Sequence, residues 1–288
     1  MASTRQLKSR IRSVKSTKQI TKAMQMVAAS KMRRAQDADK ASAPYTKAAQ
    51  ELLTYFASQG IVADHRWFVK RPVKTRLFIL IASDKGLAGA YNSNVFKEYL
   101  ARLREDDKKG IENQTIAVGR KASQFVTRLK DTTVIGTYDD MPDHPTGAQL
   151  HAILNTAKDA FEEARVDAVD VVFTNFVSSM TQTATSQRLF PAGFFEVAVS
   201  EAVREATYEP NIERVLDDAA YRLIGAQLFQ AFLDARASEH SMRMIAMKNA
   251  TDNASDLVDD LTLAMNKARQ GAITQELSEI SAGAEAMK

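Results

Sequence analysis

The last part of the chain contains no proline between Pro210 and Lys288. Proline breaks helices because it removes a backbone hydrogen bond and clashes with the preceding turn, so nothing of this kind interrupts the stretch. A repeat near 3.5 residues keeps one stripe of a helix facing a partner helix. Residues at such spacing are Met247, Ala250, Ala254, Leu257, Leu261, Ala264 and Ala268. We therefore expect a coiled-coil helix over 210–288, about 115 Å long at ~1.5 Å per residue, which is too long to be buried in its own chain.

The N-terminal segment, residues 1–58, offers a partner helix. Residues 1–57 hold 12 Lys/Arg against 3 Asp/Glu, whereas residues 209–288 hold 8 against 13. Opposite charges favour pairing of the two helices, which predicts a long antiparallel coiled coil. Pro44 is expected to kink or restart the first helix near residues 41–43. The apolar positions that we expect to face the partner are Leu7, Ile11, Val14, Ile20, Met24, Val27 and Met32.

The middle of the chain, about residues 75–205, has a different pattern. Residues 77–82 form a continuous apolar run, which is typical of a strand buried on both faces. Strands and helices that alternate at this spacing indicate an α/β unit with a mainly parallel sheet. We therefore predict an α/β fold in which a Rossmann-like domain is inserted between the two helices. Further strands are expected at 115–118, 133–137, 169–176 and 183–190, the last antiparallel, and helices at 94–104, 121–130 and 148–165.

Residues that would carry catalysis, metal binding or membrane insertion are sparse. The chain has no cysteine and no run of 18 apolar residues, which excludes disulfides, thiolate sites and a transmembrane helix. Its four histidines, His65, His144, His151 and His240, lack metal-ligand spacing. The loop at 83–89, SDKGLAG, follows a predicted strand but is neither a dinucleotide fingerprint nor a phosphate loop. We expect no catalytic residue, cofactor or metal, while a degenerate Rossmann-type nucleotide-binding enzyme stays an alternative.

Two long motifs carry a family resemblance. IRSVKSTKQITKAMQMVAASKMRRAQ near the start, with ASEHSMRMIAMKNATDNASDLV and NKARQGAITQELSEI near the end, closely resemble the gamma subunit of F-type ATP synthases of the bacterial type. The resemblance implies a non-catalytic central-stalk rotor that couples proton flow to ATP synthesis or hydrolysis. Its implied partners are a ring of three alpha and three beta subunits, the epsilon subunit and the c-subunit ring. Membrane association would come only through partners, at the cytoplasmic face of the inner or plasma membrane.

The basic N-terminal segment has two other interpretations. Its Ser/Thr content and the lack of an acid before Asp37 also describe a mitochondrial transit peptide. The resemblance argues against cleavage, because its motif already occupies residues 11–36. Basic charge also suits nucleic-acid binding, but no aromatic residue precedes Tyr45, so the segment offers bases no stacking platform. We therefore expect no nucleic-acid partner, and a chain that starts at its functional helix.

The resemblance also assigns contact residues, for which a solvated helix face is the alternative. It places Met24, Lys31, Arg33, Arg34 and Arg243 against the beta subunits. In the C-terminal helix it makes Arg269, Gln270 and Thr274 contacts to a loop of the catalytic ring. Near the foot it assigns Tyr208 and Glu209 to the c ring and the epsilon subunit. Gly271 stands where most relatives have alanine, which weakens the local helix by up to about 1 kcal/mol. A coiled-coil scaffold for some other partner stays a second alternative.

Overall fold

Two long helices and a five-stranded sheet make up the protein. The computed structural model describes residues 4–58, 65–130, 132–143, 147–193, 198–209 and 212–286. Helix α1 spans Thr4–Ser58 and helix α6 spans Ile212–Ala286, with 55 and 75 residues. The long terminal helices that the sequence predicts are therefore confirmed. Their expected limits at residues 1, 210 and 288 lie outside the described residues.

The chain divides into two compact units, and both helices contribute to each. We call Met1–Ala28 with Arg243–Lys288 the shaft unit, and Ala29–Met242 the body unit. Over its described residues, 4–28 and 243–286, the shaft unit contains only helix. The body unit contains the sheet, the shorter helices and the remaining parts of α1 and α6. The predicted domain limits of 75 and 205 stay an expectation.

The sheet of the body unit has the strand order β3-β2-β1-β4-β5. The four strands β1 to β4 are parallel, and β5 pairs antiparallel with β4, as expected. This arrangement confirms the Rossmann-like α/β prediction. The strands are β1 Thr75–Ile81, β2 Glu112–Val118, β3 Thr133–Tyr138, β4 Ala168–Phe176 and β5 Gln182–Phe190.

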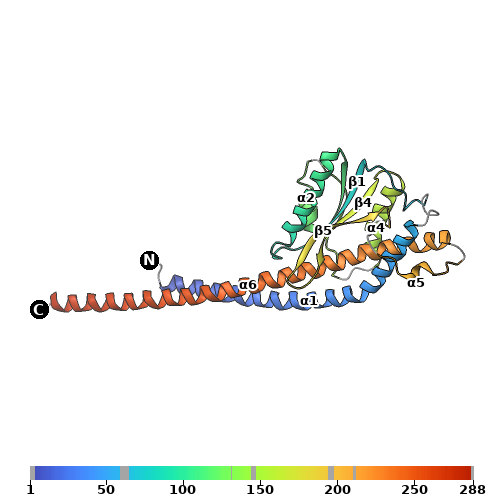
Figure 1. Cartoon of the computed structure of the whole chain (residues 1–288). Helices are drawn as coiled ribbons and strands as arrows, with labels where there is room; N and C mark the ends of the chain where they lie inside the picture. Colours follow the sequence, from blue (N-terminus) through green and yellow to red (C-terminus); the bar gives the residue numbers. More distant parts are fainter. Residues whose placement is uncertain are drawn as a thin grey trace. The chain divides into compact units, whose positions relative to one another are not determined.

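Helices cover both faces of this sheet (Figure 1). On one face, Phe78 and Val172 pack with buried residues of α2 and α3. On the other face, Ile79 and Val171 join a larger core to which α4 and parts of α1 and α6 contribute. The two long helices are therefore integral to the body unit. The shorter helices are α2 Tyr91–Lys109, α3 Arg120–Val126, α4 Gly147–Glu162 and α5 Glu201–Arg204.

Pro44 lies inside α1 without interrupting it. The sequence predicted a kink or a restart near residues 41–43, and the continuous helix excludes the restart. Figure 1 shows α1 bending in its lighter blue part, within the body unit. A bend without a break is the usual response of a long helix to an internal proline, when its other contacts hold both halves in place.

In the shaft unit, α1 and α6 form an antiparallel coiled coil. Lys18 Nζ donates to Ser255 Oγ at 2.8 Å, and the hydroxyls of Thr21 and Thr251 are hydrogen-bonded at 2.8 Å. A later position on α1 thus pairs with an earlier position on α6, which defines the antiparallel direction. The side chains of α6 that are buried here are Met247, Thr251, Ala254 and Val258, at steps of four, three and four.

The residues that face the partner helix differ in part from those predicted. Leu257 is 46% exposed, and Ile20 and Val27 of α1 are 57% and 56% exposed, so these three do not face the partner helix. Ala264 is exposed as well, whereas Ala250, Leu261 and Ala268 are half-buried. The prediction was wrong because it followed apolar residues only. The real stripe includes Thr251, whose hydroxyl bonds to Thr21 of the partner helix and to the Met247 carbonyl of its own helix. The stripe continues at Val258, next to the exposed Leu257.

Candidate functional site

The C-terminal part of α6 presents an exposed surface without a partner in the described chain. Every side chain from Arg269 to Ala282 is exposed. Among them Ile273, Leu277 and Ile280 are 50%, 62% and 69% exposed. Their steps of four and three place them along one side of the helix. An exposed apolar stripe of this kind marks an interaction surface.

The predicted contact residues Arg269, Gln270 and Thr274 lie on this exposed part of α6. Gln270 and Thr274 are one turn apart, and the Thr274 hydroxyl donates to the Gln270 carbonyl at 3.0 Å. Because residues four apart share a helix face, their side chains point the same way, with Arg269 beside them. The structure thus brings a guanidinium, an amide and a hydroxyl together on one accessible surface. This set suits a carboxylate or a polar loop of a partner.

The other predicted contacts of the shaft unit are less accessible. Met24 and Arg243 are half-buried. The large apolar residues of α1 that are exposed in this unit are instead Ile20, Met26 and Val27, which are 57%, 59% and 56% exposed. Of these three, the sequence prediction named Ile20 and Val27 as buried coiled-coil positions. Their exposure makes them candidates for contact with another protein.

The basic residues of α1 in the body unit have different surroundings. Arg33 and Arg34 are exposed. Lys31 is ion-paired with Asp143, with 2.8 Å between Nζ and Oδ2. The predicted basic surface therefore contains two accessible arginines and one lysine that is held within the chain.

Tyr208, a predicted foot contact, packs against α1. Its ring stacks on Tyr55 at 5.9 Å between centroids and meets the edge of Phe56 at 5.4 Å. Its hydroxyl donates to the carbonyl of Val203 at 2.9 Å, and burial raises the pKa of this phenol. Glu209 beside it is exposed. Tyr208 thus fixes the local chain, and Glu209 offers the accessible charge.

A second feature, which the sequence did not reveal, is a helical segment buried on all sides. Residues 231–241 of α6 are buried without exception. A helix enclosed all round is usually apolar. Here, however, the segment includes Asp234, Arg236, Ser238, Glu239, His240 and Ser241. Each buried charge needs a partner. Arg236 and Glu239 pair within the segment, and further partners of Arg236 and His240 come from distant parts of the body unit.

The partners of this segment lie at one edge of the sheet. Ser238 donates to the carbonyl of Thr174 near the end of β4, at 3.2 Å. Ser241 donates to the carbonyl of Ser179, in the loop that follows β4, at 2.8 Å. Arg236 donates to the carbonyl of Met141, in the loop that follows β3, at 2.6 Å. The segment therefore contacts the carboxyl end of the parallel sheet, which is the edge where doubly wound folds bind ligands.

Ion pairs complete the contacts of Arg236. Its guanidinium lies 2.8 Å from Glu239 and 3.1 Å from Asp84, a residue of the loop that follows β1. The pKa of this guanidinium is raised, because the charges of Glu239 and Asp84 outweigh the effect of burial. The two carboxylates and the carbonyl satisfy the two terminal nitrogens of this buried arginine, whereas its Nε is buried without a hydrogen-bond partner among the described residues.

The loop at 83–89, the candidate nucleotide site, is held by hydrogen bonds to other parts of the chain. Asp84 Oδ1 accepts the backbone N–H groups of Arg120 and Asp140 at 3.0 and 2.9 Å. Ser83 is bonded to Asn92 and to the carbonyl of Lys85. The loop thus directs a carboxylate toward α6, and the adjoining edge of the sheet is occupied by the chain's own helix. This arrangement supports a structural role for the loop.

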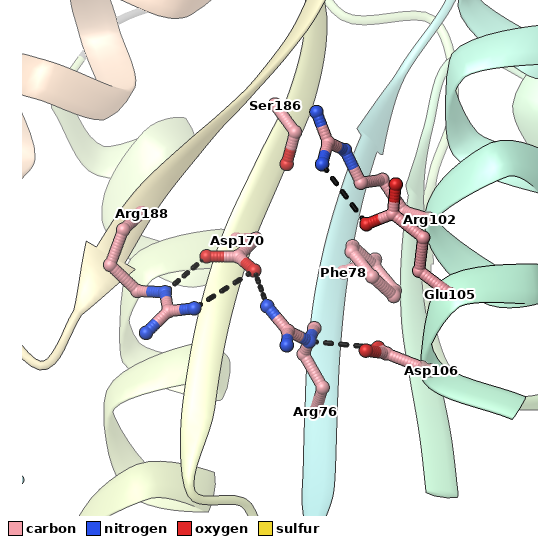
Figure 2. Close-up of a pocket in the computed structure, with 8 residues that line it drawn as sticks. All are labelled: Arg76, Phe78, Arg102, Glu105, Asp106, Asp170, Ser186 and Arg188. Atoms are coloured by element: carbon pink, nitrogen blue, oxygen red, sulfur yellow. Dashed lines mark hydrogen bonds and ion pairs between the residues drawn. The ribbon is translucent and has the colours of Figure 1, made fainter. Parts of the chain in front are cut away.

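A pocket of about 240 Å³ lies on the other side of the body unit, between α2 and strands β1, β4 and β5 (Figure 2). Arg76 pairs with Asp170 and lies 2.8 Å from Asp106, and Arg188 also pairs with Asp170. Burial raises the pKa of Asp106, and Arg76 opposes this effect. Charges in the lining are balanced, so the pocket has no surplus for an anion. The ionisable residues of the lining are Arg76, Arg102, Arg188, Glu105, Asp106 and Asp170.

The described part of the chain contains no group of three or more metal-ligating side chains. Of the four histidines, His144 lies outside that part. His240 is buried and bonded to Asp143, while His65 and His151 pack against aromatic rings.

Comparison with known proteins gives a consistent result over the full length. A family model described as ATP synthase matches residues 3–287. The ATP synthase gamma chain of Stenotrophomonas maltophilia is 40% identical over 288 residues, covering 100% of both chains. That of Xanthomonas campestris pv. campestris is also 40% identical with the same coverage.

Solved structures agree with these relatives. A chain from the central stalk and c-ring structure of Tetrahymena thermophila mitochondrial ATP synthase has a TM-score of 0.61 and 25% identity, covering 80% of this chain and 99% of that one. A chain from Euglena gracilis mitochondrial ATP synthase has a TM-score of 0.69 and 19% identity, covering 99% of this chain and 94% of that one. The second match supports the fold alone.

Proposed function

Because the chain belongs to the family of ATP synthase gamma chains and is the rotor of the central stalk, we propose that the exposed part of α6 is its contact with the catalytic ring. The observation that carries this proposal is the apolar stripe of Ile273, Leu277 and Ile280, beside the polar set at 269, 270 and 274. A helix that shows such residues to water without a partner in its own chain needs an enclosing surface. A ring of three alpha and three beta subunits would supply it.

In this function the chain itself performs no chemistry, and the catalytic sites lie on the partner beta subunits. The shaft works by being asymmetric: a turn presents a different face to each beta subunit and changes which site is open. This is rigid-body coupling, in which the contacts differ between states. Arg269 would bind an acidic or carbonyl group of a beta subunit in only some rotor positions, assisted by Gln270 and Thr274. Met24 and Arg243 would contribute smaller contacts because they are half-buried.

The body unit would supply further contacts. The exposed Arg33 and Arg34 are suited to an acidic segment of a beta subunit, with Lys31 partly committed to Asp143. Glu209 would contact the c-subunit ring or the epsilon subunit, on a loop that Tyr208 holds in place. Proton flow through the c ring would then turn the body unit and both helices.

Attachment to the membrane would be peripheral. None of the helices, over the residues described, is long and apolar enough to cross a bilayer. We infer that the chain is held at the cytoplasmic face of the inner or plasma membrane by its contacts with the c ring.

The test is the double substitution Arg269→Ala with Gln270→Ala in the reconstituted complex. The matched control is Arg104→Ala with Lys108→Ala, two exposed residues of α2 that lie outside the proposed contact. We expect both variants to assemble with normal subunit stoichiometry. Only Arg269→Ala with Gln270→Ala should lower the rates of ATP hydrolysis and coupled proton pumping, each by about tenfold. Exposed substitutions without a partner usually change stability by no more than about 0.5 kcal/mol. Full activity of the first variant in a correctly assembled complex would overturn the proposed contact.

A further inference from the structure

One carboxylate of the body unit is bound by both long helices. Asp143 follows β3, in the loop that leads toward α4. Its Oδ2 lies 2.8 Å from Nζ of Lys31 on α1, and its Oδ1 lies 3.0 Å from Nε2 of His240 on α6. His240 is 3% exposed, so its ring has a fixed position. Asp143 therefore joins three elements that are far apart in the sequence.

This bridge stands beside the buried contacts of Arg236. The loop after β3 contributes twice, through the Met141 carbonyl to Arg236 and through Asp143 to His240. Asp84 holds Arg236 from the loop after β1. Several side-chain contacts therefore connect α6 to the loops that follow the strands of the sheet. On α1, Lys31 is connected to the loop after β3 through Asp143.

We propose that Asp143 is a positioning residue that keeps α1 and α6 in register with the sheet while the rotor carries torque. This inference rests on the proposed function of the chain as a rotor. Torque applied to the body unit reaches the helices through their contacts with the sheet. Without the bridge, α1 is held less firmly against the sheet and α6 when it is loaded, and part of each turn is lost as slip.

The partial exposure of the Lys31–Asp143 ion pair distinguishes this positioning role from a contribution to the stability of the fold. The side chains of Lys31 and Asp143 are 40% and 31% exposed, whereas the core around them is closed. Loss of a half-exposed ion pair leaves the fold intact, because the apolar core supplies most of the stability. The effect is therefore expected to depend on load: small when the rotor turns freely, and large when it works against a proton gradient.

The test uses the assembled complex in sealed vesicles, with Asp143→Asn as the main variant. The matched control is Asp139→Asn in the same loop, because Asp139 accepts a hydrogen bond from Ser123 on α3 and, among the described residues, is bonded to neither long helix. ATP hydrolysis is measured with an uncoupler, and proton pumping against a rising gradient. We expect uncoupled hydrolysis within about twofold of the unmodified complex for both variants, and a pumping yield for Asp143→Asn that falls severalfold as the gradient builds. Asp143→Glu keeps the charge and should restore most of the yield.

A second measurement keeps the proposal testable if Asp143→Asn assembles poorly. Amide hydrogen exchange on the isolated full-length chain should quicken about tenfold near Lys31 and His240, equivalent to about 1.4 kcal/mol. Lys31→Met should show the same change on α1 alone. A pumping yield for Asp143→Asn equal to that of Asp139→Asn at every gradient would overturn the proposal, and so would unchanged exchange. If complexes with the unmodified chain did not pump protons at all, the rotor function itself would be contradicted. The hydrogen-exchange result would still report whether Asp143 holds the two helices, because it is measured on the isolated chain.

Discussion

Thr21 of α1 and Thr251 of α6 are hydrogen-bonded through their hydroxyls at 2.8 Å inside the coiled coil of the shaft unit. Both positions belong to the stripe that faces the partner helix, and Thr251 is 7% exposed. Polar pairs at such positions specify the register of a coiled coil, because a shift would leave them without partners. This pair therefore fixes which faces of the two helices remain outside.

A double-mutant cycle tests this pair. We expect Thr21→Val and Thr251→Val to be coupled by about 0.5–1.5 kcal/mol in the free energy of unfolding, as for a typical hydrogen bond. Urea denaturation of the two single variants and the double variant gives the value. Strict additivity would show that the hydroxyls do not interact.

The register makes a second prediction from neighbouring residues. Val258 is 9% exposed and Leu257 is 46% exposed. We expect Val258→Ala to lower the free energy of unfolding by about 1–2.5 kcal/mol through lost burial, and Leu257→Ala to change it by less than about 0.5 kcal/mol. Thermal and urea unfolding of the two variants, side by side, measure the difference. A larger loss for Leu257→Ala would restore the register predicted from the sequence.

The Asp143 bridge predicts a pH dependence. The hydrogen bond from His240, together with the hydrogen bond and charge of Lys31, holds the pKa of Asp143 well below its usual range, against the effect of burial. A carboxyl whose pKa is lower in the folded state adds stability above its unfolded pKa, about 3.9, and this is lost as pH falls through the folded value. We expect the unmodified chain to exceed Asp143→Asn in unfolding free energy by a constant amount near pH 6, and the gap to narrow below about pH 4. Urea unfolding across this range measures the gap. A gap that widens toward acid pH would contradict the assignment.

Gly271 offers a prediction about the exposed part of α6. A Cβ added there would meet no atom within 4 Å, so alanine fits without strain. Since glycine weakens a helix interior, Gly271→Ala should stabilise the local helix by about 0.5–1 kcal/mol. Amide hydrogen exchange over residues 269–282 should slow about threefold, with no change in the body unit. Faster exchange there would mean that the glycine has a role that the structure does not show.

Local patterns predicted the body unit well. The apolar run at 77–82 corresponds to β1, whose central residues are buried on both faces, and a parallel strand of this kind has a clear sequence signature. The antiparallel β5 was also anticipated, because alternation and a short connection to β4 are local features.

Long-range contacts explain what the sequence could not predict. Thr251 was passed over because a polar residue in a coiled coil is recognisable only when its partner Thr21 is known. Leu257 looked like a buried residue because leucine usually is one, and its exposure follows from the register that such pairs select. The burial of Arg236 and His240 was not predicted, because their partners Asp84 and Asp143 lie in distant loops. In the sequence, this buried segment appears only as a run of small and charged residues at 234–241, without the period of an amphipathic helix.

The most direct test of the account is to watch the rotor turn. The chain has no cysteine, so a single Arg104→Cys on the exposed side of α2 gives a unique attachment point for a bead on the body unit. The complex with alpha and beta subunits is fixed to a surface through the ring, and ATP is added. We expect continuous rotation of the bead in one direction, which stops when ATP is removed. Steady ATP hydrolysis by complexes that contain the labelled chain, with beads that only fluctuate about one angle, would contradict the account.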